Sequence, residues 1–276
     1  MIKLSPIHSE KIWGYEDWIA STHPDGLQSD FVNAVKDFPL LVKIIQANES
    51  LSVQVHPDDK DAKELEGPNT SGKTECWYVL DAEPDSKLIY GFNKNYSKEE
   101  IQKAIETNTL EPLLNIVNVK KGDFIYIPAG TVHAIGKGLR LLEVQQSCNI
   151  TYRLYDWGRD RELHIEKSLK SLKNTKPKQI EQLQEEFKCD YFELNKVSVK
   201  GGYSFFVHKQ PPTKNYGESC QLVFISKGTF SARSTKEDDI KTEYKILPEE
   251  IYVVSPGEKV TFEGTGELIR IKLPEN

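Results

Sequence analysis

Side chains of the types that bind metal ions stand close together in residues 51–80, "LSVQVHPDDKDAKELEGPNTSGKTECWYVL". Gln54 and His56 are two positions apart in an alternating run, and Glu75 opens the next apolar run. Residues i and i+2 of a strand point to the same face, about 7 Å apart along the strand. Gln54 and His56 therefore project together and can converge on one point.

A second histidine of this kind is His133. It follows a Gly-x5-Pro-x-Gly-x2-His pattern from Gly122, in which the Pro-Ala-Gly turn aims the histidine at the start of the next strand. Two imidazoles, one carboxylate and one amide oxygen suit a divalent ion such as zinc, with room for water or substrate oxygens. An open position of this kind is what makes a metal site catalytic.

Each of these residues also has a structural explanation when taken alone. His56 precedes a proline, Glu75 starts a strand and His133 follows a turn. Together, on strands rich in Val, Ile, Trp and Tyr, they indicate a metal site, because isolated buried charges are costly. The remaining histidines lack such partners and are expected to be structural or surface residues: His8, His23, His164 and His208.

Short strands with Gly and Pro at the turns must position these residues. "PLLVKIIQANESLSVQVHP" predicts a hairpin joined at residues 48–50, with Val53 and Val55 on one face and Ser52, Gln54 and His56 on the other. "ECWYVLD" and "SKLIYGF" predict a second hairpin. "GDFIYIPAG", "VHAIG" and "LRLLEVQQS" predict three further strands.

Helices are expected as inserts between the strands. Asp58 or Asp59 can cap a short helix that runs to about Leu65, and Ser97 can cap "YSKEEIQKAIE". "ELHIEKSLKSL", residues 162–172, has helical spacing, and the polar stretch after it suggests a boundary between domains 1–175 and 176–276. From "YFELNKVSV" to "ELIRIKL" a second set of strands follows, so the chain is expected to be mainly β.

The second set of strands contains a short echo of the first. "IYIPAGTVH" (125–133) and "YVVSPGEKV" (252–260) align so that Gly130 meets Gly257 and Val260 stands opposite His133. This echo suggests two related barrels, of which only the first keeps ligand residues.

Composition excludes some classes of function. Acidic residues outnumber basic ones by 42 to 36, so no general basic surface exists for nucleic acid or anionic membranes. The first residues lack the pattern of a signal peptide and no stretch is long enough to span a bilayer, so we expect neither a secreted nor a membrane-spanning protein. The four cysteines, at 76, 148, 189 and 220, form no CxxC pair and suit packing in a reducing compartment. We expect a cytoplasmic protein.

Four motifs give the chain a specific resemblance: "LSVQVHPDD", "GKTECWY", "GDFIYIPAGTVHAIGKG" and "NITYRLYDWGR". They closely resemble the type I phosphomannose isomerases of the cupin superfamily, in their short bacterial form. The likeness runs from "EKIWGYEDW" to about residue 172 and is weaker beyond. A generic cupin would offer His-x-His, whereas here Gln54 takes the place of the first histidine and a helical insert separates His56 from Glu75.

The resemblance implies a cupin jelly-roll barrel with helical inserts and a second, smaller cupin-like β-barrel. It implies one zinc ion per chain, held by Gln54, His56, Glu75 and His133, and an active-site arginine at Arg153. The reaction implied is the interconversion of mannose 6-phosphate and fructose 6-phosphate through a cis-enediol. A sugar phosphate would then be the partner, and the oligomeric state stays open.

The catalytic base and the phosphate site are left open by the sequence. Lys73 shares a strand face with Glu75, and desolvation beside zinc and Arg153 would lower its pKa toward that of a base. It is an equally good phosphate ligand, and Asp156 is a third candidate base that could instead orient Arg153. No Walker-type loop occurs. The candidate substrate-binding residues are Ser52, Lys73, Arg153, Asp156 and Arg159.

Four aromatic residues could wall a sugar pocket, although Trp77 is better explained as core: Trp13, Trp18, Trp77 and Tyr152. Two other functions compete with the isomerase. One is a different metal-dependent cupin enzyme, such as an iron oxygenase, which would favour a histidine-rich triad. The other is a sugar-binding protein that kept the fold and lost turnover.

Overall fold

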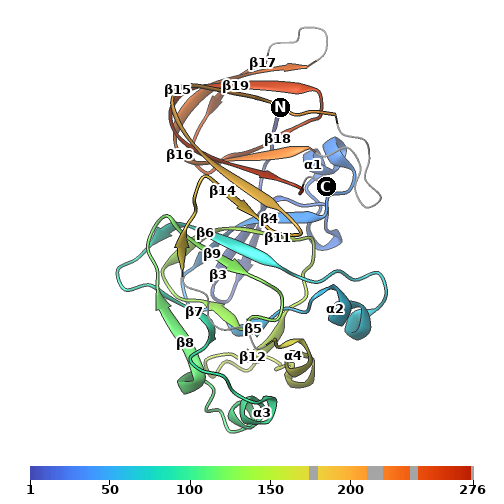
Figure 1. Cartoon of the computed structure of the whole chain (residues 1–276), viewed down its shortest axis with the longest axis vertical. Coiled ribbons are helices and arrows are strands. Elements are labelled where there is room, and N and C mark those ends of the chain that lie inside the picture. Colours follow the sequence, from blue (N-terminus) through green and yellow to red (C-terminus); the bar gives the residue numbers. More distant parts are fainter. Residues whose placement is uncertain (174–179, 210–219, 237–241, 275–276) are drawn as a thin grey trace. The chain divides into compact units, whose positions relative to one another are not determined.

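The computed structural model of the chain describes residues 1–173, 180–209, 220–236 and 242–274. The chain divides into two compact units. One, here called the central unit, comprises His8–Asp17 and Leu41–Gln182; the other, the terminal unit, comprises Met1–Ile7, Trp18–Leu40 and Leu183–Asn276. Figure 1 shows that strands dominate both units.

The larger sheet of the central unit has seven strands in the order β13-β9-β6-β11-β4-β3-β2. Antiparallel pairing sets Glu75 of β6 opposite Gln145 of β11 and opposite Ile127 of β9. Its strands are β2 (Ile7–Lys11), β3 (Gly14–Ala20), β4 (Leu40–Ala47), β6 (Glu75–Ala82), β9 (Asp123–Ile127), β11 (Leu139–Gln146) and β13 (Glu181–Gln182).

The smaller sheet of the central unit has five strands in the order β12-β5-β10-β7-β8. In it Gln54 of β5 stands between His133 of β10 and Arg153 of β12. Its strands are β5 (Val53–Val55), β7 (Lys87–Phe92), β8 (Leu114–Asn118), β10 (His133–Ile135) and β12 (Tyr152–Tyr155).

Both predicted hairpins are wrong, although the strands themselves form. β4 lies in the seven-stranded sheet and β5 in the five-stranded sheet; β6 and β7 are divided in the same way. Each connection therefore carries the chain from one sheet to the other instead of turning it back beside itself. The three strands expected after Gly122 are present as β9, β10 and β11.

Apolar side chains pack on both faces of the five-stranded sheet. One cluster fills the space between the sheets, with Leu88, Tyr90 and Ile135 from the smaller sheet against Trp77 and Ile125 from the larger. The inner face of the five-stranded sheet therefore looks toward the seven-stranded sheet.

A second cluster covers the outer face of the five-stranded sheet. Val53 and Val55 of β5 pack there, together with residues of α3 and α4. Since side chains alternate along a strand, Ser52, Gln54 and His56 point the other way, into the space between the sheets. This confirms the alternation predicted for β5.

The helices of the central unit follow local signals in the sequence. Asp58 caps α2 by accepting a hydrogen bond from the Asp61 N–H, and Ser97 and Glu100 form a capping box at α3, as predicted. α4 occupies the stretch predicted for residues 162–172. The helices are α2 (Asp59–Glu66), α3 (Lys98–Glu106) and α4 (Ile165–Ser171), with a 3-10 turn η2 (Glu111–Leu113).

The terminal unit is built on one sheet of long strands, in the order β1-β18-β16-β19-β15-β14, with β17 paired to β16. An apolar cluster that includes Phe230, Tyr252 and Phe262 packs on it. Its elements are β1 (Ile2–Lys3), η1 (Pro24–Gly26), α1 (Ser29–Val35), β14 (Glu186–Lys188), β15 (Glu193–Phe206), β16 (Gln221–Lys236), β17 (Thr242–Ile246), β18 (Ile251–Val254) and β19 (Glu258–Lys272).

The compact units do not coincide with the expected domains 1–175 and 176–276. Residues 1–7 and 18–40 group with the C-terminal strands, since β1 pairs with β18 through Ile2 opposite Val253. The expected boundary fell partly on residues 174–179, which lie outside the described residues. The division into a metal-binding and a metal-free domain stays a prediction.

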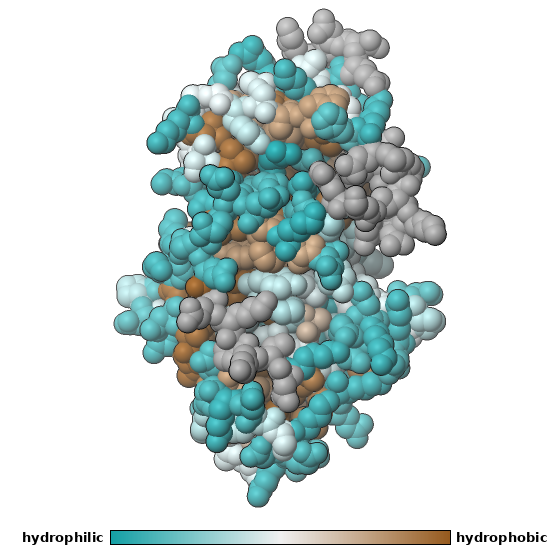
Figure 2. All heavy atoms as spheres, in the orientation of Figure 1, coloured by the Kyte–Doolittle hydropathy of each residue, from teal (hydrophilic) through white to brown (hydrophobic). Residues whose placement is uncertain are grey.

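The surface is predominantly polar on the face drawn in Figure 2, where apolar side chains appear between hydrophilic ones. Exposed large apolar side chains come from separate parts of the chain, such as Ile12 in the turn after β2 and Ile116 in β8. Among the described residues, no helix is long and apolar enough to cross a membrane.

Candidate functional site

His56, Glu75 and His133 meet in the space between the two sheets of the central unit. Glu75 begins β6 of the larger sheet, His133 begins β10 of the smaller sheet, and His56 directly follows β5. His56 Nε2 lies 3.6 Å from Glu75 Oε2, and His133 Nε2 lies 3.2 Å from Glu75 Oε1. The imidazole centroids are 4.8 Å apart, and all three residues are at most 1% exposed.

Backbone carbonyls fix the tautomer of both imidazoles. His56 Nδ1 lies 2.8 Å from the Ile150 oxygen, and His133 Nδ1 lies 2.9 Å from the Thr131 oxygen. A carbonyl oxygen only accepts, so each Nδ1 carries the proton and each Nε2 presents a lone pair toward Glu75. Outer hydrogen bonds of this kind are typical of metal-binding histidines.

Burial keeps both imidazoles neutral. Desolvation lowers the pKa of His133 to about 4 and holds the pKa of His56 well below its usual value. The neutral imidazole is the form that binds metal ions.

Two buried atoms of this group, His56 Nε2 and Glu75 Oε1, have no hydrogen-bond partner among the described residues, whereas Glu75 Oε2 lies 2.8 Å from Lys73 Nζ. Native proteins seldom leave such atoms unsatisfied. The ligand atoms of the three residues lie within 4.8 Å of one another. Two imidazole lone pairs and a carboxylate directed to one point fit a divalent cation.

Gln54 lies next to this group and has an amide side chain in place of a carboxylate or imidazole. Its Nε2 lies 3.2 Å from His133 Nε2, where the histidine lone pair accepts the hydrogen bond. A half-turn of the amide would place Oε1 toward the histidines instead. The side chain can therefore offer an oxygen, as the resemblance implied.

Arg153 shares a row with two of these residues. It is the cross-strand partner of Gln54, which is in turn the partner of His133, so the three side chains lie on one face of the sheet. Arg153 Nη1 donates to the Glu162 oxygen at 2.7 Å, and its buried Nε has no partner among the described residues. Burial, and then the charge of Arg161, lower the pKa of Arg153, but a guanidinium stays protonated near neutral pH.

Two further charged residues, Lys43 and Glu143, lie beside the site and were missed by the sequence analysis. Glu143 Oε1 lies 3.6 Å from Lys43 Nζ and 3.9 Å from Lys73 Nζ, while its Oε2 accepts a 2.8 Å hydrogen bond from Trp77 Nε1. All are buried. Lys73 Nζ also lies 2.8 Å from Glu75 Oε2, so this buried charge cluster of Lys43, Glu143 and Lys73 adjoins the histidine group.

The pKa of Lys73 moves opposite to the expectation. Burial alone would lower it, but the carboxylates of Glu143 and Glu75 outweigh burial and raise it. Lys73 is therefore a fixed ammonium ion in this structure. Burial raises the pKa of Glu143, against the opposing effect of Lys73.

A sequence signal for the missed residues does exist. Lys43 interrupts the apolar run "LLVKII", and Glu143 interrupts "LRLLEV". Both runs are strands, β4 and β11, and a charged residue inside a buried strand requires a partner. The sequence indicates that each residue needs a partner, but it does not show that Lys43 and Glu143 pair with each other.

Asp156 contacts two arginines other than Arg153. Its carboxylate accepts hydrogen bonds from Arg159 Nε and Nη2, at 3.1 and 2.8 Å, and from Arg161 Nε and Nη2, both at 2.7 Å. Burial alone would raise the pKa of Asp156, but the two guanidiniums lower it. Asp156 therefore does not orient Arg153 by a hydrogen bond, and its pKa is not raised as expected of a general base. Arg159 Nη2 also donates to the Ser50 oxygen at 2.8 Å.

The four aromatic residues considered for a sugar pocket are packed in cores. Trp13 and Trp77 belong to the cluster between the sheets, and Trp77 meets the His133 ring edge-on at 5.4 Å between centroids. Tyr152 packs in the outer cluster, and its hydroxyl donates to Glu66. Trp18 is buried in the terminal unit. Trp77 thus supports the site through His133 and Glu143.

The other histidines have the structural or surface positions expected. His8 is exposed beside Asp17 and Glu10, His23 caps η1, and His208 lies edge-on to Phe206. His164 stands at the start of α4, where its Nδ1 accepts the Arg153 backbone N–H.

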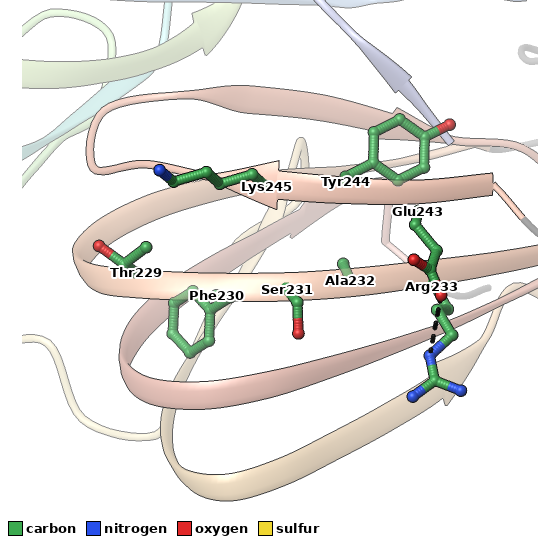
Figure 3. Close-up of a pocket in the computed structure, with 8 residues that line it drawn as sticks. All are labelled: Thr229, Phe230, Ser231, Ala232, Arg233, Glu243, Tyr244 and Lys245. Atoms are coloured by element: carbon green, nitrogen blue, oxygen red, sulfur yellow. Dashed lines mark ion pairs between the residues drawn. The ribbon is translucent and has the colours of Figure 1, made fainter.

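A separate cavity of about 620 Å³ lies in the terminal unit, between β16 and β17 (Figure 3). Arg233 there pairs with Glu243 and Glu263. These pairs are exposed to solvent, unlike the buried ligand atoms of the histidine group.

Two facing β-sheets with a buried His-Glu-His group between them define a mainly β protein with a candidate metal site. Residues 4–86 match the family described as phosphomannose isomerase type I, catalytic domain. The chain is thus similar to the type I phosphomannose isomerases, which confirms the resemblance found in the sequence.

Curated relatives carry the corresponding name. The chain is 44% identical over 183 residues to mannose-6-phosphate isomerase ManA of Bacillus subtilis, covering 60% of this chain and 58% of the relative. It is 51% identical over 146 residues to mannose-6-phosphate isomerase of Streptococcus mutans, covering 51% and 45%. The chain thus matches about half the length of these relatives.

Solved structures extend the likeness over the whole chain. The crystal structure of the Bacillus subtilis mannose 6-phosphate isomerase matches with a TM-score of 0.81 and 27% identity, covering 98% of both chains. A mannose 6-phosphate isomerase bound with zinc and yttrium matches at 15% identity with a TM-score of 0.67, covering 98% of each, and shows the same fold. The mainly β cupin fold expected from the sequence is confirmed.

Proposed function

We propose that the chain is a metal-dependent aldose-ketose isomerase that interconverts mannose 6-phosphate and fructose 6-phosphate. The observation that carries the proposal is the convergence of buried ligand atoms of His56, Glu75 and His133 within 4.8 Å of one another, with His56 Nε2 and Glu75 Oε1 lacking a hydrogen-bond partner among the described residues. The names of the relatives supply the reaction and its substrate.

The cation would be held by His56, Glu75 and His133, with Gln54 as a fourth ligand through its amide oxygen. We propose one zinc ion per chain, because two neutral imidazoles and a carboxylate are a usual zinc set. When bound, such an ion polarises a carbonyl and stabilises developing negative charge. The backbone carbonyls of Ile150 and Thr131 hold the rings in the tautomer that leaves Nε2 free.

Arg153 would supply a fixed positive charge on the substrate side of the site. Its position beside Gln54 places the guanidinium on the inner face of the five-stranded sheet. The enediolate that forms when a carbon-bound proton leaves is an anion, so a charge that is already in place lowers the barrier.

For the proton transfer between C1 and C2, we propose Glu143 instead of Lys73 or Asp156. A carboxylate whose pKa is raised by burial can take and return a proton, whereas Lys73 is held protonated by two carboxylates. Lys73 would then contribute its charge to the substrate or to Glu143. Asp156 is occupied by Arg159 and Arg161.

The phosphate group would bind near that arginine pair. Asp156 neutralises only one of the two guanidinium charges, and both side chains are partly exposed. Guanidinium groups bind phosphate oxygens in bidentate fashion. Ser52, buried on the face of Gln54, remains a candidate for a substrate hydroxyl or phosphate oxygen.

A coupled assay that detects fructose 6-phosphate formed from mannose 6-phosphate tests the proposal directly. We expect turnover that a chelator abolishes and that zinc restores. Turnover insensitive to a chelator would remove the metal from the mechanism. Sugar-phosphate binding without turnover would favour the binding protein, and oxidation of a substrate with consumption of oxygen would favour the oxygenase.

A further inference from the structure

Gln145 has a side-chain oxygen that is buried and without a partner among the described residues. The residue is 0% exposed and belongs to β11. We propose that Gln145 Oε1 accepts a hydrogen bond from a non-reacting hydroxyl of the sugar, at C3 or C4. This inference rests on the proposed function and adds a specificity-determining residue to it.

The orientation of the Gln145 amide is determined by its own hydrogen bonds. Nε2 donates to the Gln146 oxygen at 2.9 Å and to the Cys148 oxygen at 2.6 Å. Turning the amide over would set Oε1 against two carbonyl oxygens, which cannot donate. Both N–H groups are therefore used, and Oε1 is held as an acceptor with no donor from the described chain.

The backbone places Gln145 on the face that carries the candidate site. It is the cross-strand partner of Glu75, and Glu143, two residues earlier, is the partner of Trp77. Directly opposed residues of antiparallel strands project to the same face, as do residues two apart. Gln145, Glu75 and Glu143 thus extend into the same buried space between the sheets.

Gln145 Oε1 is an acceptor that needs a hydrogen-bond donor, and a sugar has several hydroxyl groups that can donate. In the proposed function the oxygens at C1 and C2 lie at the cation and the phosphate lies at the arginines. The hydroxyls at C3 and C4 are the donors that remain between these two ends. A buried group that loses its intended partner discriminates strongly against a ligand that lacks it.

The test compares mannose 6-phosphate with its 3-deoxy and 4-deoxy analogues, using the zinc-loaded full chain. Wild type is expected to show a kcat/KM that is lower by about 5- to 150-fold for one of the two analogues. Gln145→Met, similar in length but without the amide, should lose about that factor on the parent sugar and less than about threefold on that analogue.

Gln146→Met is the matched control. Gln146 accepts from the Thr74 N–H at 2.8 Å and donates to Asp59 at 3.1 Å, so its bonds are structural and its side chain lies on the other face of β11. This variant should keep the wild-type ratio between parent and analogue. Equal losses on all three sugars in Gln145→Met would mean a structural role only and would overturn the inference, as would no loss at all.

A second variant and a binding measurement cover the case in which Gln145→Met does not fold. Gln145→Leu also lacks the amide oxygen and should lose the same discrimination between parent and analogue. Calorimetric titration with mannitol 6-phosphate and its 4-deoxy and 3-deoxy forms, which cannot isomerise, should reproduce the same ratio in affinity. If wild type turns over no mannose 6-phosphate, the proposed function fails, and these titrations still decide the role of Gln145.

Discussion

Glu75 Oε1 lies 3.2 Å from His133 Nε2, although the two residues come from different sheets. The proton of His133 is on Nδ1, where the Thr131 oxygen accepts it, so the lone pair of Nε2 faces a carboxylate oxygen. Two acceptors at this distance repel each other in a buried space, and a cation between them would turn this repulsion into attraction. This contact is the physical basis of the metal-site proposal.

His133→Ala is expected to lower zinc affinity by more than about 100-fold, since it removes a direct ligand where even outer partners contribute about 10- to 100-fold. Isomerase turnover should disappear with the metal. The fold should remain, because the apolar clusters on both faces of the five-stranded sheet stay intact when the His133 ring is removed. Metal content by mass spectrometry and zinc titration by calorimetry measure the effect.

His8→Ala is the matched control for this prediction. His8 is exposed and contacts only charged or aromatic neighbours at the surface. Its zinc content and activity should equal those of wild type. One zinc per chain retained in His133→Ala would contradict the proposed ligand set.

Arg153→Ala is expected to keep the metal and to lose about two to four orders of magnitude in kcat, as with other transition-state charges. Arg153→Lys should recover little, because Lys cannot reproduce the planar guanidinium and its donors. Zinc content and kcat measured on the same preparations separate the two effects. Near-normal kcat in Arg153→Ala would end its proposed role.

Arg233→Ala serves as the arginine control. Arg233 lies in the terminal unit, half-exposed and paired with Glu263 at 3.0 Å. An exposed pair of this kind contributes at most about 1 kcal/mol to stability. Activity and zinc content should therefore be unchanged in this variant.

Glu143→Gln is expected to lower kcat by about 10²- to 10⁴-fold while zinc stays bound. The amide keeps the shape and an acceptor for Trp77 Nε1, but it cannot take a proton. Exchange of the substrate hydrogen at C2 with deuterated water, followed by NMR, isolates the proton-transfer step. Exchange should slow in parallel with kcat.

Asp156→Asn is the comparison that decides between the two carboxylates. It should weaken the hold on Arg159 and Arg161 and raise KM, with hydrogen exchange at C2 largely preserved. The opposite pattern, in which Asp156→Asn stops exchange and Glu143→Gln does not, would assign the base to Asp156.

Local features of the fold could be read from the sequence, whereas pairings between distant strands could not. The period of two along β5 correctly put Gln54 and His56 on one face, and the caps at Asp58 and Ser97 were correct. The two hairpins were wrong because β5 and β7 pair with strands of the other sheet. Nothing within a strand and its turn specifies which sheet it enters.

The electrostatics of the site show the same limit. The direction of the Lys73 pKa depends on Glu143, which the chain brings from β11 to within 3.9 Å. Zinc and Arg153 alone would lower the pKa of Lys73, which is the direction predicted from the sequence. The hydrogen bonds of His56 and His133 to carbonyls of Ile150 and Thr131 were also invisible, since every residue has a carbonyl.

Gly130 connects the fold to the site, because its N–H donates to the His56 oxygen at 2.8 Å and its φ is +86°. A Cβ there would lie 2.1 Å from Lys173 Cγ and 2.9 Å from the Ser171 oxygen. Gly130→Ala should therefore destabilise the protein by both backbone strain and steric clash.

Gly122→Ala is the control that separates these two causes. Gly122 has nearly the same φ, +89°, but a Cβ there would meet only the Gln182 side chain at 3.6 Å. Backbone strain alone costs about 1 kcal/mol, so Gly122→Ala should lose about that amount in urea unfolding. Gly130→Ala should lose more and should also weaken zinc binding, because the turn that carries it leads into His133. Equal losses in the two variants, with zinc affinity unchanged, would show that the packing of this turn against α4 does not support the site.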